Sequence, residues 1–131
     1  MQNPKMVILD LKKNKDARIQ AAFQLENIAD EASIEALAQA MFTDPSPIVR
    51  HECAFALGET AAPKITCFHL IKAVEKDESP FVRHEALMAL GTLGDLSCIP
   101  FIKKFLHDPD PNIAESAEIA LQRLKMTSSP H

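Results

Sequence analysis

The sequence predicts an all-α protein, a right-handed alpha-solenoid of about four helical hairpins, and three observations support this fold class. Residues 46–58 (SPIVRHECAFALG) return as residues 79–91 (SPFVRHEALMALG), so that His51 and His84 stand 33 residues apart (84 − 51). A period of this length is typical of stacked helical hairpins. The 131 residues include only 3 Gly, and Ala and Leu dominate, which favours helix. No segment alternates polar and apolar residues over a useful length, so strands are not expected.

The individual helices follow from apolar residues at helical spacing and from starts that contain proline. Ser46 is a good N-cap, and Pro47 at the first helical position loses nothing by lacking an N–H. The same device recurs at Ser79-Pro80 and Asp110-Pro111, and each of these three starts begins a helix. The other expected helices lie over about 4–12, 16–28, 32–42, 64–76 and 96–107.

These helices pair into four repeats of a single domain, residues 1–125. Aligning the second helix of each repeat gives a column of Leu25, Leu57, Leu90 and Leu121. The column two residues earlier holds Phe23, Phe55, Met88 and Ile119. Phe55, Met88 and the alanine columns are expected in the core. The repeats are expected at roughly 3–29, 31–58, 62–93 and 95–125, and residues 126–131 are expected to be a disordered tail.

Two further repeated residue types have a structural interpretation. Arg50 and Arg83 recur on the first turn of the second helix, where they are expected to pair with carboxylates of a neighbouring turn and form a ladder along the stack. Gly58 and Gly91 recur near the end of the same helix, where they are expected to allow close helix packing.

Composition excludes several functions. The net charge is −4 and no run of Lys or Arg exceeds two, which disfavours nucleic-acid binding. No apolar run approaches 18 residues, so neither a membrane span nor a membrane partner is expected. Three widely spaced cysteines without a Cys-x-x-Cys spacing indicate reduced thiols, and the start of the chain lacks a signal-peptide pattern. A soluble, cytoplasmic protein is the expectation.

The His-Glu pair is the part of the repeat that packing does not require. The His column reads Ile19, His51, His84 and Glu115. The Glu column reads Gln20, Glu52, Glu85 and Ser116. The pair is therefore dispensable for building a repeat and specific to the central two repeats. Passive internal duplication of a helix-surface pair is the competing interpretation.

The His-Glu column has the geometry of a shared metal site. Equivalent positions on stacked helices about 8–10 Å apart project in the same direction. Two imidazoles can then meet at one metal, with nitrogen–metal distances near about 2.1 Å. Imidazoles and carboxylates without a thiolate suit iron(II), manganese or catalytic zinc.

The same residues resemble deoxyhypusine hydroxylase, a family built of HEAT-like repeats. The matching stretches are Val49-Arg50-His51-Glu52 with Phe55-Ala56-Leu57-Gly58, and Val82-Arg83-His84-Glu85-Ala86 with Ala89-Leu90-Gly91. In that family, His-Glu pairs on successive repeats, two in each half of the chain, hold a non-haem diiron centre that activates dioxygen. The enzyme hydroxylates the deoxyhypusine side chain of a translation initiation factor.

The resemblance implies a metal site formed by His51, Glu52, His84 and Glu85. The cofactor would be iron, two ions per assembled site, with dioxygen as co-substrate. Glu52 and Glu85 would also be catalytic residues through contact with the substrate amine. The implied activity is that of a non-haem diiron monooxygenase acting on an amine-bearing, deoxyhypusine-like protein side chain.

This chain departs from the family pattern in having two His-Glu pairs where the family has four. It resembles one half of the enzyme, and a homodimer of two-fold symmetry would restore four His and four Glu. A different half-chain is another way to complete the site. The expected partners are a second copy and a protein substrate, such as the deoxyhypusine-bearing initiation factor. The alternative is a non-catalytic HEAT-repeat scaffold that binds a protein on its concave face. A related variant is an accessory lyase or chaperone, because similar repeats occur in bilin lyases.

Overall fold

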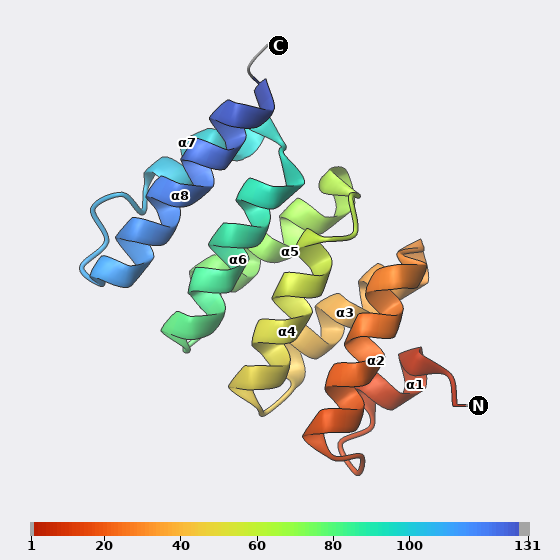
Figure 1. Ribbon diagram of the computed structural model, residues 1–131. Coiled ribbons are helices and arrows are strands. Elements are labelled where there is room, and N and C mark those ends of the chain that lie inside the picture. The colour runs from red at the N-terminus through yellow and green to blue at the C-terminus, as the bar shows by residue number, and fades with distance from the viewer. Residues whose placement is uncertain (1, 129–131) are drawn as a thin grey trace.

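The computed structural model describes residues 2–128, which form an α-solenoid of four helical hairpins (Figure 1). The elements are α1 (Pro4–Leu9), α2 (Lys15–Ile28), α3 (Glu31–Thr43), α4 (Pro47–Gly58), α5 (Pro63–Lys76), α6 (Pro80–Leu93), the 3₁₀-helix η1 (Leu96–Cys98), α7 (Ile99–Lys103) and α8 (Pro111–Ser128). No strand occurs within residues 2–128. The predicted fold class is therefore confirmed.

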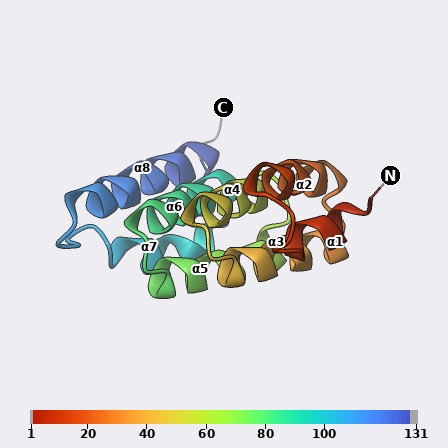
Figure 2. The same cartoon turned by 90° about the horizontal axis from the view of Figure 1, so that it is seen from below.

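The helices form two layers with the core between them (Figure 2). One layer holds α2, α4, α6 and α8, and the other holds α1, α3, α5 and α7. Within the first layer, α6 packs against both α4 and α8. Leu25, Leu57 and Leu90 are fully buried and Leu121 is 8% exposed, so the predicted leucine column lies in the core. None of the helices described is both long and apolar enough to cross a bilayer.

The expected arginine ladder is present and has one more rung than expected. Arg18 Nε lies 2.8 Å from Asp44 Oδ2, and Arg50 Nε lies 3.0 Å from Asp77 Oδ2. The third rung joins Arg83 Nη2 to Asp108 Oδ2 at 3.4 Å. Each rung ties the second helix of one repeat to the turn inside the next repeat, which fixes the stacking of neighbouring hairpins.

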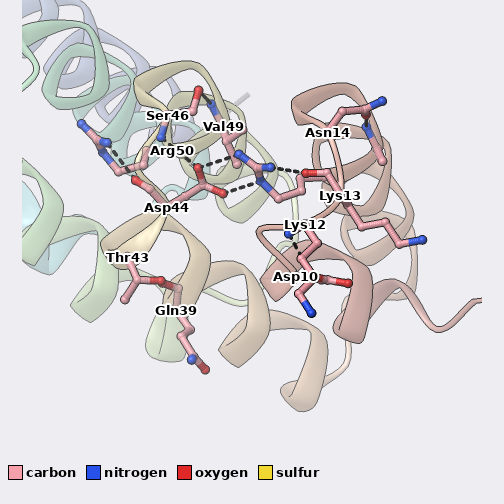
Figure 3. Close-up of polar contacts among 12 residues, drawn as sticks. Asp10, Lys12, Lys13, Asn14, Gln39, Thr43, Asp44, Ser46, Val49 and Arg50 are labelled. Carbon is pink, nitrogen blue, oxygen red and sulfur yellow. Dashed lines mark hydrogen bonds and ion pairs between the residues drawn. The ribbon is translucent and has the colours of Figure 1, made fainter.

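The same aspartates also organise the turns in which they lie. Asp44 Oδ1 accepts a hydrogen bond from Ser46 N at 2.9 Å, and the Asp44 carbonyl accepts one from Arg50 Nη1 at 2.9 Å (Figure 3). Ser46 caps α4 through its side chain, whereas Ser79 occupies the N-cap position of α6 without a side-chain hydrogen bond. Asp77 Oδ1 instead accepts from Ser79 N at 2.9 Å.

Gly58 and Gly91 stand where neighbouring helices approach most closely. A Cβ atom on Gly58 would lie 2.7 Å from Ala89 Cβ, and one on Gly91 would lie 2.9 Å from Ala120 Cα. Real Cβ contacts are essentially never this short, so glycine allows α4, α6 and α8 to pack at this separation. The expectation of close packing is confirmed.

Two expected helices are shorter in the structure. The first ends at Leu9 instead of residue 12, because Asp10 Oδ1 accepts from Lys12 N and turns the chain. The segment 96–107 is divided into η1, α7 and a tight turn. Pro100 has no N–H to donate, and after Lys103 the backbone continues through i→i+3 bonds such as Leu106 N to Lys103 O.

Two other sequence expectations concern a column of apolar residues and the end of the chain. The column Phe23, Phe55, Met88 and Ile119 is not in the core: Phe55 is 40% exposed and the other three are half-buried. The cause is that these residues follow the His column by four positions, which places them on the same open helix face. The tail expected at 126–131 lies partly outside the described residues, and α8 continues to Ser128.

Candidate functional site

The His-Glu column lies on two adjacent helices of one layer. His51 and Glu52 belong to the second turn of α4, and His84 and Glu85 occupy the equivalent turn of α6 (Figure 1). The side chains of His51, Glu52 and Glu85 are 17%, 27% and 15% exposed, so they are largely shielded but reachable from solvent. The fold therefore places both His-Glu pairs on the same face of the stack.

His51 is held between two carboxylates. Its Nε2 lies 3.3 Å from Glu85 Oε2 on the next helix, and its Nδ1 lies 3.5 Å from Glu52 Oε1. The ring stacks on Phe81, with centroids 4.1 Å apart. The hydrogen bond to Glu85 raises the pKa of His51 above its ordinary value, against the opposing effect of burial, and Glu52 adds to the rise. This pocket therefore favours a positive charge.

His84 has a different partner, and its ring tautomer follows from the hydrogen bonds. Its Nδ1 bonds with Ser116 Oγ, and Ser116 Oγ donates its proton to the Asn112 carbonyl at 2.6 Å. Since a hydroxyl has one proton, Ser116 must accept from His84, and we assign the His84 proton to Nδ1. The Nε2 of the neutral ring then carries a lone pair. A metal-binding histidine has this arrangement, with one nitrogen donating and the other free for the metal.

Both histidines thus reach the Glu column of the following repeat. His51 meets Glu85, and His84 meets Ser116, which occupies the equivalent position in the last repeat. Within residues 2–128, no three residues of the His-Glu column bring one donor atom each to within 4.8 Å of one another. One chain therefore offers converging pairs of donors and does not enclose an ion by itself.

Two hollows flank the column. The first, of about 410 Å³, lies between α6 and α8 and is lined by Pro80, Phe81, His84, Asn112, Glu115, Ser116 and Ile119. The second, of about 420 Å³, lies between α4 and α6 and is lined by Phe55, Gly58, Glu59, Glu85, Met88, Ala89, Thr92 and Arg123. Each hollow combines apolar walls with a carboxylate and a residue of the column, and the second also has Arg123 of α8 in its lining. Such a surface suits a side chain with an apolar stem and a cationic end.

Glu26 and Glu59 extend the acidic character of this face, and sequence reasoning missed both. Burial raises the pKa of Glu26, and the charges of Glu59 and Glu52 raise it further. Its Oε1 is buried without a hydrogen-bond partner. The repeat pattern held no signal for them, because the first two repeats align at an offset of 32 residues (57 − 25), which pairs Glu26 with Gly58 and not with Glu59. By contrast, His69 lies on α5 in the other layer, 3.5 Å from Glu35.

A second group of ligand-type side chains was also missed. Cys67, Asp95 and Cys98 each offer one ligand atom, and these atoms lie within 4.8 Å of one another. No other group of three or more His, Cys, Asp or Glu residues within the described part of the chain meets this distance. The sequence held a partial signal, because Cys67 and Cys98 are 31 residues apart (98 − 67), the same offset that separates Leu90 from Leu121, whereas nothing in the repeat pattern pointed to Asp95.

Comparison with known proteins gives a consistent result. A family model described as HEAT repeats matches residues 6–66 and 69–130. The deoxyhypusine hydroxylase of Schizosaccharomyces pombe is 42% identical over 112 residues, covering 86% of this chain and 35% of that protein. The Drosophila melanogaster enzyme is 36% identical over 112 residues, covering 86% of this chain and 37% of that protein.

A solved structure supports the same similarity to deoxyhypusine hydroxylases. Human deoxyhypusine hydroxylase in complex with glycerol superimposes with a TM-score of 0.91 at 29% identity, covering 98% of this chain and 46% of that chain. The sequence resemblance is therefore confirmed over most of the chain. The chain spans little more than a third of the length of the curated relatives above.

Proposed function

Because this chain belongs to the HEAT-repeat family and is similar to deoxyhypusine hydroxylases over most of its length, we propose that it is an iron-dependent monooxygenase of that type. Its substrate would be an amine-bearing, deoxyhypusine-like side chain of a protein, such as a translation initiation factor in the cytoplasm. The main structural support for this proposal is the contact between His51 Nε2 and Glu85 Oε2 at 3.3 Å, which brings metal-donor atoms of two repeats together on one face.

The donor set fits iron. His51, Glu52, His84 and Glu85 provide nitrogen and oxygen donors of the type that iron(II) accepts. The free lone pair on His84 Nε2 and the preference of the His51 pocket for a positive charge both favour a cation here. Bound iron would supply the dioxygen-activating chemistry of the reaction. The protein residues would hold the ions, orient the substrate and exclude water.

The substrate amine would be held by the same acidic face. Glu85 and Glu59 line the hollow between α4 and α6, and Phe55 and Met88 form apolar walls of the same hollow. A long alkyl amine places methylene groups against the apolar walls and its ammonium against a carboxylate. We therefore propose that Glu52 and Glu85 contact the amine as well as the metal, with Glu59 attracting the positive charge.

A second copy of the chain would complete the site. One chain presents converging pairs of donors, whereas a bridged pair of ions needs more ligands than it provides. Phe81 and Ile48 are each 51% exposed, and both flank the His-Glu positions in sequence. Covering this face with its equivalent in a two-fold dimer would bury these apolar side chains and double the number of ligands. The proposed assembly is a homodimer with the iron ions between the two faces.

Metal analysis and product analysis test this proposal together. Protein produced with added iron should retain iron, and a deoxyhypusine-bearing protein should gain one oxygen atom, detected by mass spectrometry. The His51→Ala and His84→Ala variants should lose both properties. His69→Ala is the matched control, because His69 lies in the other layer and should be dispensable. Absence of iron above background in the unaltered, iron-supplied protein would contradict the proposal.

The alternative function is a non-catalytic scaffold that binds a protein partner on the face bearing the His-Glu column. The exposure of Phe55 and Phe81 on that face favours a covering partner of some kind. The two functions differ in their dependence on metal. A scaffold would bind its partner equally well after His51→Ala/His84→Ala and in the presence of a chelator, whereas substrate turnover would cease in both cases.

A further inference from the structure

We propose that Cys67, Asp95 and Cys98 form a second metal site, which takes a thiophilic divalent cation of the zinc class and joins the third hairpin to the fourth. The three ligand atoms lie within 4.8 Å of one another. Cys67 and Cys98 are 5% and 4% exposed, and both are free thiols. This site lies outside the His-Glu column and does not depend on the proposed hydroxylase activity.

The local fold brings the three ligands together. Asp95 is the N-cap of η1, and a 3₁₀-helix has three residues per turn, so the side chains of Asp95 and Cys98 lie on the same side of the turn. Cys67 comes from the first half of α5 in the preceding hairpin, and its sulfur lies within 4.8 Å of the Cys98 sulfur. The cluster thus forms where one repeat ends and the next begins.

Asp95 is already oriented by its neighbours. Its Oδ1 accepts hydrogen bonds from Ser97 N at 3.0 Å and from Ser97 Oγ at 2.7 Å. Metal-binding carboxylates are commonly held by such outer hydrogen bonds, which reduce the cost of ordering the ligand. The carboxylate of Asp95 is therefore held beside the two sulfur atoms.

The ligand chemistry selects the cation. Two thiolates and a carboxylate suit zinc, with zinc–sulfur distances of about 2.3 Å and zinc–oxygen distances of about 2.0–2.2 Å. Tetrahedral ligands at those distances stand roughly 3.3–3.8 Å apart, so the side chains need to close only slightly. Each thiol releases its proton to solvent as its sulfur binds, and no electron transfer is involved. The bound cation would link α5 to η1 and so fasten two repeats together.

Cobalt(II) is a suitable probe, because thiolate ligands give it a charge-transfer absorption that imidazole and carboxylate ligands do not. The full chain, kept reduced and anaerobic, should develop this absorption with one equivalent of Co²⁺ and lose it on addition of Zn²⁺. Zn²⁺ should also raise the thermal unfolding midpoint. Cys98→Ser should abolish both effects, and Ser97→Ala should weaken Co²⁺ binding about tenfold.

Two controls separate this site from the rest of the protein. Cys53 is a fully buried thiol that belongs to no such cluster, so Cys53→Ala should leave the absorption unchanged. The His51→Ala/His84→Ala variant should also retain it, which separates this site from the proposed iron site. Circular dichroism of each variant verifies folding. The proposal is wrong if the unaltered protein shows no thiolate charge transfer, or if it keeps this signal after Cys98→Ser.

Discussion

His51 and His84 occupy equivalent positions of two repeats but differ in the groups that their rings meet. His51 contacts a carboxylate at each nitrogen, whereas His84 Nδ1 contacts the hydroxyl of Ser116. The cause lies in the next repeat, where the Glu column changes from Glu85 to Ser116. The repeat period predicted that the histidines share a face. It could not predict their different partners, because these depend on how far each side chain reaches across to the next helix.

The pKa of His51 in the metal-free protein should depend mainly on Glu85. The Glu85 hydrogen bond is the largest cause of the raised pKa, so Glu85→Gln should lower the pKa more than Glu52→Gln does. A raised folded-state pKa stabilises the fold fully below the unfolded value of about 6.5, and this contribution is lost as the pH rises through the raised pKa. An NMR titration of the imidazole measures the effect. An unchanged pKa in Glu85→Gln would mean that the contact does not form in solution.

The Arg–Asp ion pairs that join neighbouring repeats differ in burial, so we expect their removal to cost different amounts of stability. The Arg and Asp side chains are 6% and 1% exposed in the Arg18–Asp44 pair, and 23% and 16% exposed in the Arg83–Asp108 pair. Removing one partner of a buried pair costs roughly 3 kcal/mol or more, whereas exposed pairs contribute at most about 1 kcal/mol. Arg18→Met should therefore lower the free energy of unfolding by about 3 kcal/mol, and Arg83→Met, whose pair is less buried and longer, by a smaller amount of roughly 1–2 kcal/mol. Urea unfolding of the two variants would refute this gradient if the losses were equal.

The repeated positions differ in how well the sequence predicts their burial and their contacts. Leu57, Gly58 and Arg50 were placed correctly because their roles depend on contacts that every repeat makes with its neighbour. Phe55 was misplaced because an apolar residue that recurs in register resembles a core residue. Its burial depends instead on whether another layer covers its face, and this layer of helices is covered on one side only. The single helix expected over 96–107 was wrong for a local reason. Pro100 has no N–H, so it cannot donate the backbone hydrogen bond that a continuous helix starting at residue 96 would need.

The solenoid as a whole explains why part of the site could be predicted. Each second helix lies beside the next with little rotation, so a residue type that recurs every repeat forms a row on one face (Figure 2). The His-Glu row follows from this rule alone. The Cys67–Asp95–Cys98 cluster does not, because it joins a helix to a connecting turn and depends on the path of the chain between repeats.

Assembly and metal binding should be linked if the iron site forms between two chains. Any ligand that binds the dimer more tightly than the monomer favours the dimer, and dimerisation in turn raises the affinity for that ligand by the same factor. Anaerobic Fe²⁺ should therefore shift the protein from monomer to dimer in sedimentation experiments, and the iron retained per chain should rise with protein concentration.

The double variant His51→Ala/His84→Ala separates the two contributions to assembly. It should lose the response to Fe²⁺, while any dimer that it still forms reflects the exposed apolar residues such as Phe81 and Ile48. His69→Ala should respond like the unaltered chain, because its side chain lies in the other layer near Glu35. Iron bound at full stoichiometry by a chain that stays monomeric at every concentration would rule out a site shared between two copies. The His-Glu ligands of a single chain would then have to close around the metal alone, which their present separation into pairs argues against.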